Sequence, residues 1–287
     1  MPVAHINDLE IACDVIGNGD QHWAITPGGR FSKDYGGVRE LAEGVADTGR
    51  TVLIWDRPNC GASSVAFTGS SESALQADTL AELIRQLGFG PAVIAGGSGG
   101  SRVSLLTVAR NPDIATGLAM WWISGGIFGL MALGWHYCGW SIDNAWKYDM
   151  AKVAEQPEWQ EVIERNPGNR DRFLAMDRME FLDTMQRWMA AYAPPAGQTI
   201  PGIPNDDIGA ISVPTIVFRS GESDPAHPRA TSEALAALVP GAALLEPPWG
   251  DREWIERGEA AATDGTSLFA RWPLLLPQLT EFGDTIT

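Results

Sequence analysis

The chain has 287 residues, a formal net charge of −16, 45% hydrophobic residues, 12 tryptophans and three cysteines. This length and apolar content are sufficient for a large packed core and exclude a chain that is mainly disordered. The acidic balance, with no local cluster of Lys or Arg to reverse it, argues against nucleic acid and against a membrane surface as partners.

The N-terminal segment does not look like an export signal. Asp8, Glu10 and Asp14 stand where a signal peptide has a basic start followed by an apolar run, so we expect a cytoplasmic protein. The three cysteines are odd in number and widely spaced, which predicts neither a disulfide framework nor a zinc site. The most apolar stretch, 118–135, is broken by glycines and Ser124 and is not expected to cross a membrane.

Short apolar segments alternate with amphipathic segments along most of the chain. After an N-terminal β-ribbon at 4–5 and 9–15, the segments with the length of a buried strand are 21–26, 50–55, 92–95, 117–123, 214–218 and 242–245. Helical spacing of apolar residues occurs between them at 38–46, 73–87, 101–110 and 231–239, and 267–282 predicts a closing helix. The alternation predicts an α/β fold, with a mostly parallel twisted sheet flanked by helices on both faces.

The alternation stops between 126 and 208, where the chain becomes helical in pattern. We therefore predict core residues 1–125, an inserted helical cap at 126–208 and core residues 209–287, with the cap over the sheet edge at which ligands bind in such folds. The middle third of the chain is also rich in indoles, which slightly favours a ligand pocket over simple core filling. These indoles are Trp121, Trp122, Trp135, Trp140, Trp146, Trp159 and Trp188.

The most informative motif is Gly96-Gly97-Ser98-Gly99-Gly100, which lies between an apolar strand and an amphipathic helix. A Gly-x-Ser-x-Gly pattern in this context predicts a nucleophile elbow, a strained turn that presents the serine hydroxyl at a helix N-terminus. A phosphate-binding loop is less consistent with the sequence, because neither Gly-Lys-Ser/Thr nor the dinucleotide spacing is present. Ser98 is therefore the candidate nucleophile.

With this motif the chain resembles the α/β-hydrolase family, over nearly its whole length apart from the insertion. Pro27-Gly28-Gly29-Arg30 stands where the family has its oxyanion loop, so the resemblance implies that the backbone N–H groups of Gly29 and Gly99 receive an oxyanion. The segment 56–63 resembles the family's Asp-x-x-Gly-x-Gly-x-Ser loop, with Asn59 in place of its first glycine. The segment 220–228 matches the acid loop, with Asp224 at the acid position.

The sequence departs from the family at the last landmark. The aligned segment runs from Trp249 to Glu256, and Asp251 stands where the family has its catalytic histidine. No histidine follows His227, so a small shift of the alignment does not restore the triad. A serine hydroxyl without an adjacent base is a weak nucleophile, and the base must therefore come from elsewhere.

Three hypotheses follow from this departure. In the first, His227, on the same loop as Asp224, or His136, early in the insertion, supplies the imidazole. In the second, Asp224 and Asp251 face one cavity and act as acid and base without an acyl-serine, in epoxide or lactone opening, hydration or isomerisation, unless nearby arginines hold both carboxylates ionised. In the third, the protein is a non-catalytic sensor or carrier of a small apolar ligand.

The lead expectation is a hydrolase that cleaves an ester, lactone or C–C bond of a hydrophobic small molecule through Ser98. Asp224, His227 and Asp251 are the further catalytic candidates, and no metal or organic cofactor is expected. The expected substrate-binding residues are Arg30, His136, Trp122 and Trp249. The expected partner is this small molecule, and assembly as a homodimer is left open.

Overall fold

The computed structural model describes residues 3–286 and centres on one twisted eight-stranded sheet. The order of the strands is β1-β2-β4-β3-β5-β6-β7-β8, in which β1–β2 and β2–β4 pair antiparallel and all later pairs are parallel. The sheet thus agrees with the fold class expected from the sequence. Its strands are β1 (Val3–Ile6), β2 (Leu9–Ile16), β3 (His22–Thr26), β4 (Thr51–Trp55), β5 (Ala92–Gly97), β6 (Ala115–Trp121), β7 (Thr215–Phe218) and β8 (Ala243–Leu245).

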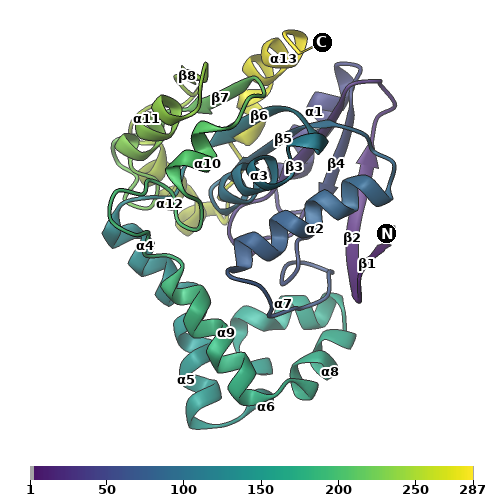
Figure 1. Ribbon diagram of the computed structural model, residues 1–287, viewed down its shortest axis with the longest axis vertical. Coiled ribbons are helices and arrows are strands. Elements are labelled where there is room, and N and C mark those ends of the chain that lie inside the picture. The colour runs from purple at the N-terminus through teal and green to yellow at the C-terminus, as the bar shows by residue number, and fades with distance from the viewer. Residues whose placement is uncertain (1–2, 287) are drawn as a thin grey trace.

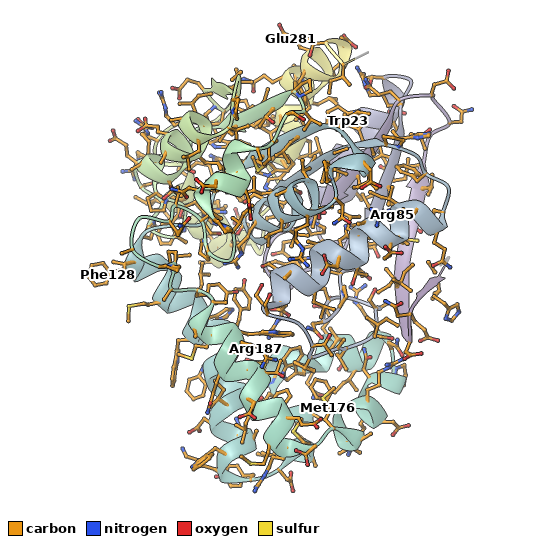
Figure 2. The ribbon with its side chains drawn as sticks, viewed as in Figure 1. Trp23, Arg85, Phe128, Met176, Arg187 and Glu281 are labelled. Carbon is orange, nitrogen blue, oxygen red and sulfur yellow. The ribbon has the colours of Figure 1, made fainter. Side chains whose placement is uncertain are left out.

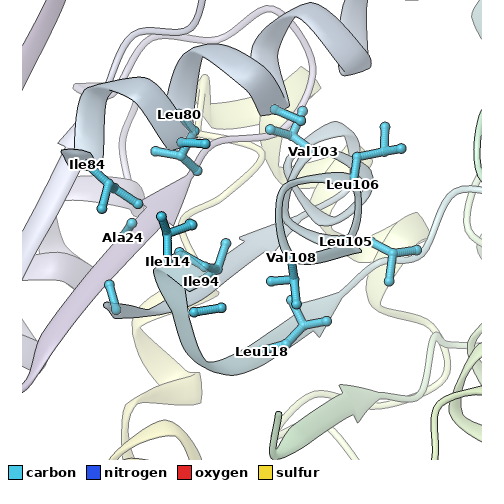
Figure 3. Close-up of a cluster of buried hydrophobic side chains, with 14 of the residues drawn as sticks. Ala24, Leu80, Ile84, Ile94, Val103, Leu105, Leu106, Val108, Ile114 and Leu118 are labelled. Atoms are coloured by element: carbon cyan, nitrogen blue, oxygen red, sulfur yellow. The ribbon is translucent and has the colours of Figure 1, made fainter. Parts of the chain in front are cut away.

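Helices cover both faces of the sheet because its central strands are apolar on both sides (Figure 1). The core on one face includes side chains of α2 (Glu72–Gln86) and α3 (Gly99–Arg110), which meet strand residues such as Ile94 and Leu118 (Figure 3). Leu235 of α11 (Arg229–Leu238) belongs to the same core. The opposite face packs against α1 (Val38–Asp47), the 3-10 helix η3 (Trp272–Leu275) and α13 (Leu276–Asp284). The short helices η1 (Pro112–Ile114) and α10 (Asn205–Gly209) lie in connections.

A helical insertion joins β6 to β7 and forms the lower lobe in Figure 1. It consists of α4 (Ile127–Gly134), the π-helix η2 (Trp135–Gly139), α5 (Trp140–Lys147), α6 (Met150–Ala154), α7 (Pro157–Arg165), α8 (Gly168–Ala175) and α9 (Arg178–Ala190). The insertion has an apolar core of its own, to which Trp159, Phe173 and Trp188 contribute. It is anchored to the sheet domain by the fully buried amide of Asn169, which accepts a hydrogen bond from the Val65 N–H (2.8 Å) and donates one to the Ser63 carbonyl (2.9 Å).

The C-terminal part of the fold differs from the sequence expectation in two places. The closing helix is not continuous over 267–282, because a 3-10 turn begins at Trp272 and the α-helix begins only at Leu276, with Pro at the start of each. Helix α12 (Glu253–Asp264) was not expected at all. No helix within residues 3–286 combines the length and the apolar character needed to cross a membrane.

Candidate active site

Ser98 lies at the sharp turn between β5 and α3 in a backbone conformation that is rare for a side-chain-bearing residue, with φ 56° and ψ −124°. The turn brings main-chain segments into close contact, and two glycines make this approach feasible. A Cβ at Gly96 would lie 2.6 Å from the Gly100 carbonyl oxygen, and a Cβ at Gly100 would lie 2.2 Å from the Thr26 carbonyl oxygen. The sequence therefore confines Ser98 to a strained turn at the start of α3.

An imidazole is placed against this serine by the loop that follows β7. The Nε2 atom of His227 lies 2.8 Å from the Ser98 Oγ, and its Nδ1 atom lies 2.8 Å from the Oδ2 of Asp224. The other carboxylate oxygen of Asp224 accepts hydrogen bonds from the backbone N–H groups of Ala226 and His227, each at 3.0 Å. The Asp224 carboxylate thus stabilises the tight loop and also orients the imidazole ring of His227.

One charged residue of α12, Arg257, completes the surroundings of Asp224. The Nη2 of Arg257 donates a hydrogen bond to the Asp224 Oδ2 at 3.0 Å, and its guanidinium lies 3.9 Å from the ring centroid of Trp122. Burial alone would raise the pKa of Asp224, but the hydrogen bond from His227 and the charge of Arg257 outweigh burial and lower it. Asp224 is therefore held as a carboxylate.

The indole of Trp122 packs against the imidazole of His227. Trp122 is buried, has a positive φ of 50°, and its ring stacks on that of His227 at a centroid distance of 6.1 Å and an interplanar angle of 27°. Trp249 packs on Trp122 in turn, with 5.7 Å between ring centroids. These two indoles restrict the movement of His227 and do not line the cavity described next.

A cavity of about 580 Å³ opens above Ser98 and His227. Its walls are mostly apolar, and most of them come from α12 and from the segment that follows it. The lining residues are Gly29, Phe31, Ser98, Tyr137, His227, Trp254, Ile255, Arg257, Gly258, Glu259, Ala262, Leu268 and Phe269. A cavity of this size and polarity fits a small hydrophobic molecule.

Gly29 lines the same cavity as Ser98. It has φ +51°, a conformation that disfavours any residue with a Cβ, and such a Cβ would also lie 2.8 Å from the Phe31 ring. The turn that contains Gly29 adjoins the start of α3, because a Cβ at Gly99 would be 3.2 Å from the backbone nitrogen of Gly29. The two glycines expected to receive an oxyanion are thus neighbours beside the serine.

Asp251 and Asp224 do not face one cavity, contrary to the second hypothesis. The Asp251 side chain is 58% exposed, forms an ion pair with Arg229 and does not line the cavity above Ser98. Its backbone carbonyl accepts a hydrogen bond from the Ser223 N–H at 3.1 Å, so residue 251 supports the acid loop through its main chain.

Two further residues expected at the substrate lie elsewhere. Arg30 forms an ion pair with Glu72 at 3.2 Å and packs over the ring of Trp159, so its charge is used in joining the insertion to the sheet domain. His136 lines a separate hollow with Trp140 and Asn144. Neither side chain lines the cavity above Ser98.

The expected indole-rich pocket is also largely absent at this cavity. Of the middle-third tryptophans, Trp121, Trp159 and Trp188 are packed in cores, and Trp135, Trp140 and Trp146 are exposed. Phe128 on α4 likewise projects into solvent (Figure 2). Among residues 3–286, the one indole that lines the cavity is Trp254, on the helix that sequence reasoning missed. The i, i+4 pair Glu253 and Arg257 was a signal of that helix.

Glu253 is a carboxylic acid near the site whose ionised form is destabilised by burial. It is 2% exposed, and its Oε1 lies 3.6 Å from the Arg257 Nε. Burial raises the pKa of Glu253 from 4.5 to about 7, and the attraction of Arg257 offsets this only in part. The folded state therefore binds a proton more tightly than the unfolded state, and the free energy of unfolding falls as the pH rises from 4.5 to about 7.

Replacing Glu253 with glutamine should remove this pH-dependent penalty. We expect E253Q to exceed the wild type in free energy of unfolding by up to about 3 kcal/mol at pH 8, with a difference near zero at pH 4.5. Urea titrations at the two pH values measure the effect. E256Q, on the more exposed part of the same helix, is the control, and an equal effect of E253Q at both pH values would contradict the assignment.

Within residues 3–286, no group of three or more His, Cys, Asp or Glu side chains is placed to hold a metal ion. The three cysteines are buried and unpaired with one another. The polar residues that line the cavity are Ser98, His227, Arg257, Glu259 and Tyr137, and Asp224 lies behind His227. This arrangement can transfer a proton from the serine hydroxyl to an imidazole held in place by a carboxylate.

Comparison with known proteins identifies one matching family. Residues 19–277 match the model of the "Alpha/beta hydrolase family". No protein of known, curated function matches the sequence.

Solved structures similar to this one cover almost the whole chain at low identity. The enol-lactonase from Burkholderia xenovorans LB400 is 20% identical, with 98% of this chain and 99% of that chain covered and a TM-score of 0.58. Est816, described as an N-acyl homoserine lactone degrading enzyme, is 18% identical, with both chains fully covered and a TM-score of 0.61. A thermophilic esterase from Thermogutta terrifontis is 19% identical, with 96% and 95% covered and a TM-score of 0.59. At this identity, the similarity establishes a shared fold.

Proposed function

Because the chain belongs to the alpha/beta hydrolase family, we propose that it is a serine hydrolase that cleaves esters or lactones of small hydrophobic molecules. The observation that carries the proposal is the continuous hydrogen-bonded series from Ser98 Oγ through His227 to the Asp224 carboxylate, with 2.8 Å at each step. The esterase and lactonases of the same fold agree with this class of substrate.

In the proposed reaction, His227 Nε2 accepts the Ser98 proton as the hydroxyl oxygen attacks the substrate carbonyl carbon. Asp224 stabilises the imidazolium that forms, through the hydrogen bond at Nδ1. The backbone N–H groups of Gly29 and Gly99 receive the negative charge that develops on the carbonyl oxygen. His227 then protonates the leaving alkoxide, and water attacks the acyl-serine with the same imidazole as base.

The other parts of the site fit supporting roles in this chemistry. Arg257 keeps Asp224 ionised, and Trp122 limits the rotation of the His227 ring. The insertion at 126–208 acts as the cap, since Tyr137 from η2 lines the cavity above Ser98. The apolar walls from Phe31, Leu268 and Phe269 hold the acyl or lactone hydrocarbon.

Hydrolysis of p-nitrophenyl butyrate and of a short N-acyl homoserine lactone tests this proposal. The wild type should turn over at least one of them, and S98A should lose that activity while keeping the wild-type Tm to within a few degrees. An S98A variant with most of the wild-type rate would reject the serine mechanism. Tight binding without product from a range of esters and lactones would instead favour the non-catalytic hypothesis.

A further inference from the structure

Another, much smaller cavity, of about 20 Å³, is lined by Gly29 in the turn after β3 and by Gly99 at the start of α3. It is bounded by α2, α3, the loops that follow β3 and β4, and the insertion. Its lining residues are Gly29, Arg30, Arg57, Glu72, Ser73, Gln76, Gly99, Arg102, Tyr137 and Tyr192. We call it the arginine cavity. Gly29 and Tyr137 also line the larger cavity above Ser98, so the two spaces share a wall.

The charges around the arginine cavity do not balance. Three guanidinium groups line it, but the only carboxylate among the lining residues is that of Glu72. Glu72 is bound by Arg30, whose Nε and Nη2 donate to its two oxygens at 3.2 and 3.3 Å. Arg57 and Arg102 form no ion pair within the described part of the chain. The lining therefore carries a net positive charge.

These two arginines also have unused hydrogen-bond donors. Arg57 is 2% exposed and directs Nη2 to the carbonyl oxygen of Gly29 at 2.6 Å, but its Nε–H has no partner within residues 3–286. Arg102 is 7% exposed, lies over the Tyr192 ring at 4.5 Å, and its Nε–H is likewise buried and unpaired among those residues. Burying a charged donor without an acceptor is costly. An acceptor in the cavity that both arginines line would therefore stabilise the folded protein.

The size of the cavity limits what can enter. About 20 Å³ is sufficient for one particle of the size of a water molecule and too small for a carboxylate with its carbon chain. A neutral water would satisfy the geometry but leave the positive charge uncompensated. A monatomic anion accepts hydrogen bonds from several directions and also offsets the charge of the guanidinium groups.

We propose that the arginine cavity is a binding site for a halide ion of the size of chloride, held by the guanidinium groups of Arg57 and Arg102. The ion reduces the repulsion between the two guanidinium groups and fixes the β3 and β4 loops against α3. Because it binds the folded state, it stabilises the fold by mass action. The site stands on the placement of these arginines and does not depend on the reaction proposed for Ser98.

Thermal unfolding at constant pH and ionic strength tests the site directly. Sodium gluconate is replaced stepwise with sodium chloride, and Tm is measured at each chloride concentration. At a chloride concentration about ten times the dissociation constant of the site, the wild-type Tm should be higher by about 3 °C or more. Sodium sulfate should give no such rise, because the tetrahedral ion does not fit the cavity. Equal Tm values in gluconate and chloride, or an equal rise in sulfate, would overturn the proposal.

Variants locate the effect at the cavity. R102Q should abolish the chloride-dependent rise, whereas R110Q, which removes an exposed arginine from the same helix, should keep it. If R102Q does not fold, crystals of the wild type grown in bromide decide, since anomalous scattering should show bromide between Arg57 and Arg102. Absence of that peak, or a chloride effect that persists in R102Q, would reject the site, and neither result bears on the hydrolase proposal.

Discussion

Replacing His227 with alanine is expected to lower kcat/KM for ester hydrolysis by about 10⁴- to 10⁶-fold. The Nε2 of His227 is hydrogen-bonded to the Ser98 Oγ, and its removal leaves the hydroxyl with no base at that position. Most of the loss should be in kcat, because the apolar walls that bind the substrate are unchanged. Steady-state kinetics with p-nitrophenyl butyrate measure both constants.

The matched control for this variant is H136A. His136 lies in the insertion and lines a hollow distinct from the cavity above Ser98, so its loss should change kcat/KM by less than about threefold. An H136A variant as impaired as H227A would place the imidazole in the insertion instead. An H227A variant that keeps a tenth or more of the wild-type rate would show that the base is not His227.

Replacing Asp224 with asparagine is expected to lower kcat by about 10⁴-fold. The amide cannot stabilise an imidazolium as the carboxylate does, and it favours the wrong tautomer of His227. It also leaves Arg257 without its ionised partner at 3.0 Å. The pKa of Asp224 is lowered in the folded protein, so the carboxylate is present at every pH above its unfolded value and the loss should persist from pH 6 to pH 9.

The same substitution at Asp251 separates the two carboxylate hypotheses. D251N removes an exposed ion pair with Arg229 and should leave kcat within about threefold of the wild type. Measuring Tm for both variants corrects for any loss of folded protein. Greater impairment of D251N than of D224N would restore the mechanism in which Asp251 handles the proton.

The placement of both acid and base on one loop explains how the sequence can lack a histidine at position 251. Asp224 uses one oxygen to accept the backbone N–H groups of the loop and the other to hold the ring of His227. Pro225 and Pro228 flank this turn and limit its conformations. The loop therefore supplies both the acid and the base. Residue 251 contacts the loop through its backbone carbonyl, which accepts a hydrogen bond from the Ser223 N–H.

Asn59 shows how a departure from the family pattern can be local in its effect. It stands at a glycine position of the loop after β4 and has φ 71°, which asparagine tolerates better than most residues. Its side chain donates hydrogen bonds to the Ala66 carbonyl and to Glu72, and accepts one from the Ala66 N–H. The replacement thus connects the loop to α2 in a way that glycine cannot.

Much of the fold was predictable because each core strand is a short apolar segment that ends at Gly, Pro, Ser or an acid. The turn at Ser98 was also predictable, because the close main-chain contacts of Gly96 and Gly100 leave no room for a side chain. The roles of residues that act through contacts with distant parts of the sequence were not predictable. Arg257 meets Asp224 across 33 positions of sequence, and nothing local to either residue indicates this pairing.

The tryptophans illustrate the same limit. A side chain of this size is equally suited to a core, a pocket or a surface, and its partners decide which of these it enters. Trp159 is enclosed by Phe67 and Phe173, whereas Trp135 packs on Trp140 and stays exposed. Composition alone therefore suggested an indole-rich pocket, and the cavity is formed instead by α12 and the segment that follows it.

The rate of phosphonylation of Ser98 by a fluorophosphonate, followed by intact mass, tests the central claim that His227 activates this serine. We expect one adduct on the wild type and on D251N at similar second-order rates, and a rate at least about 10³-fold lower for H227A. Equal labelling of the wild type and H227A, or loss of labelling in D251N alone, would contradict the account.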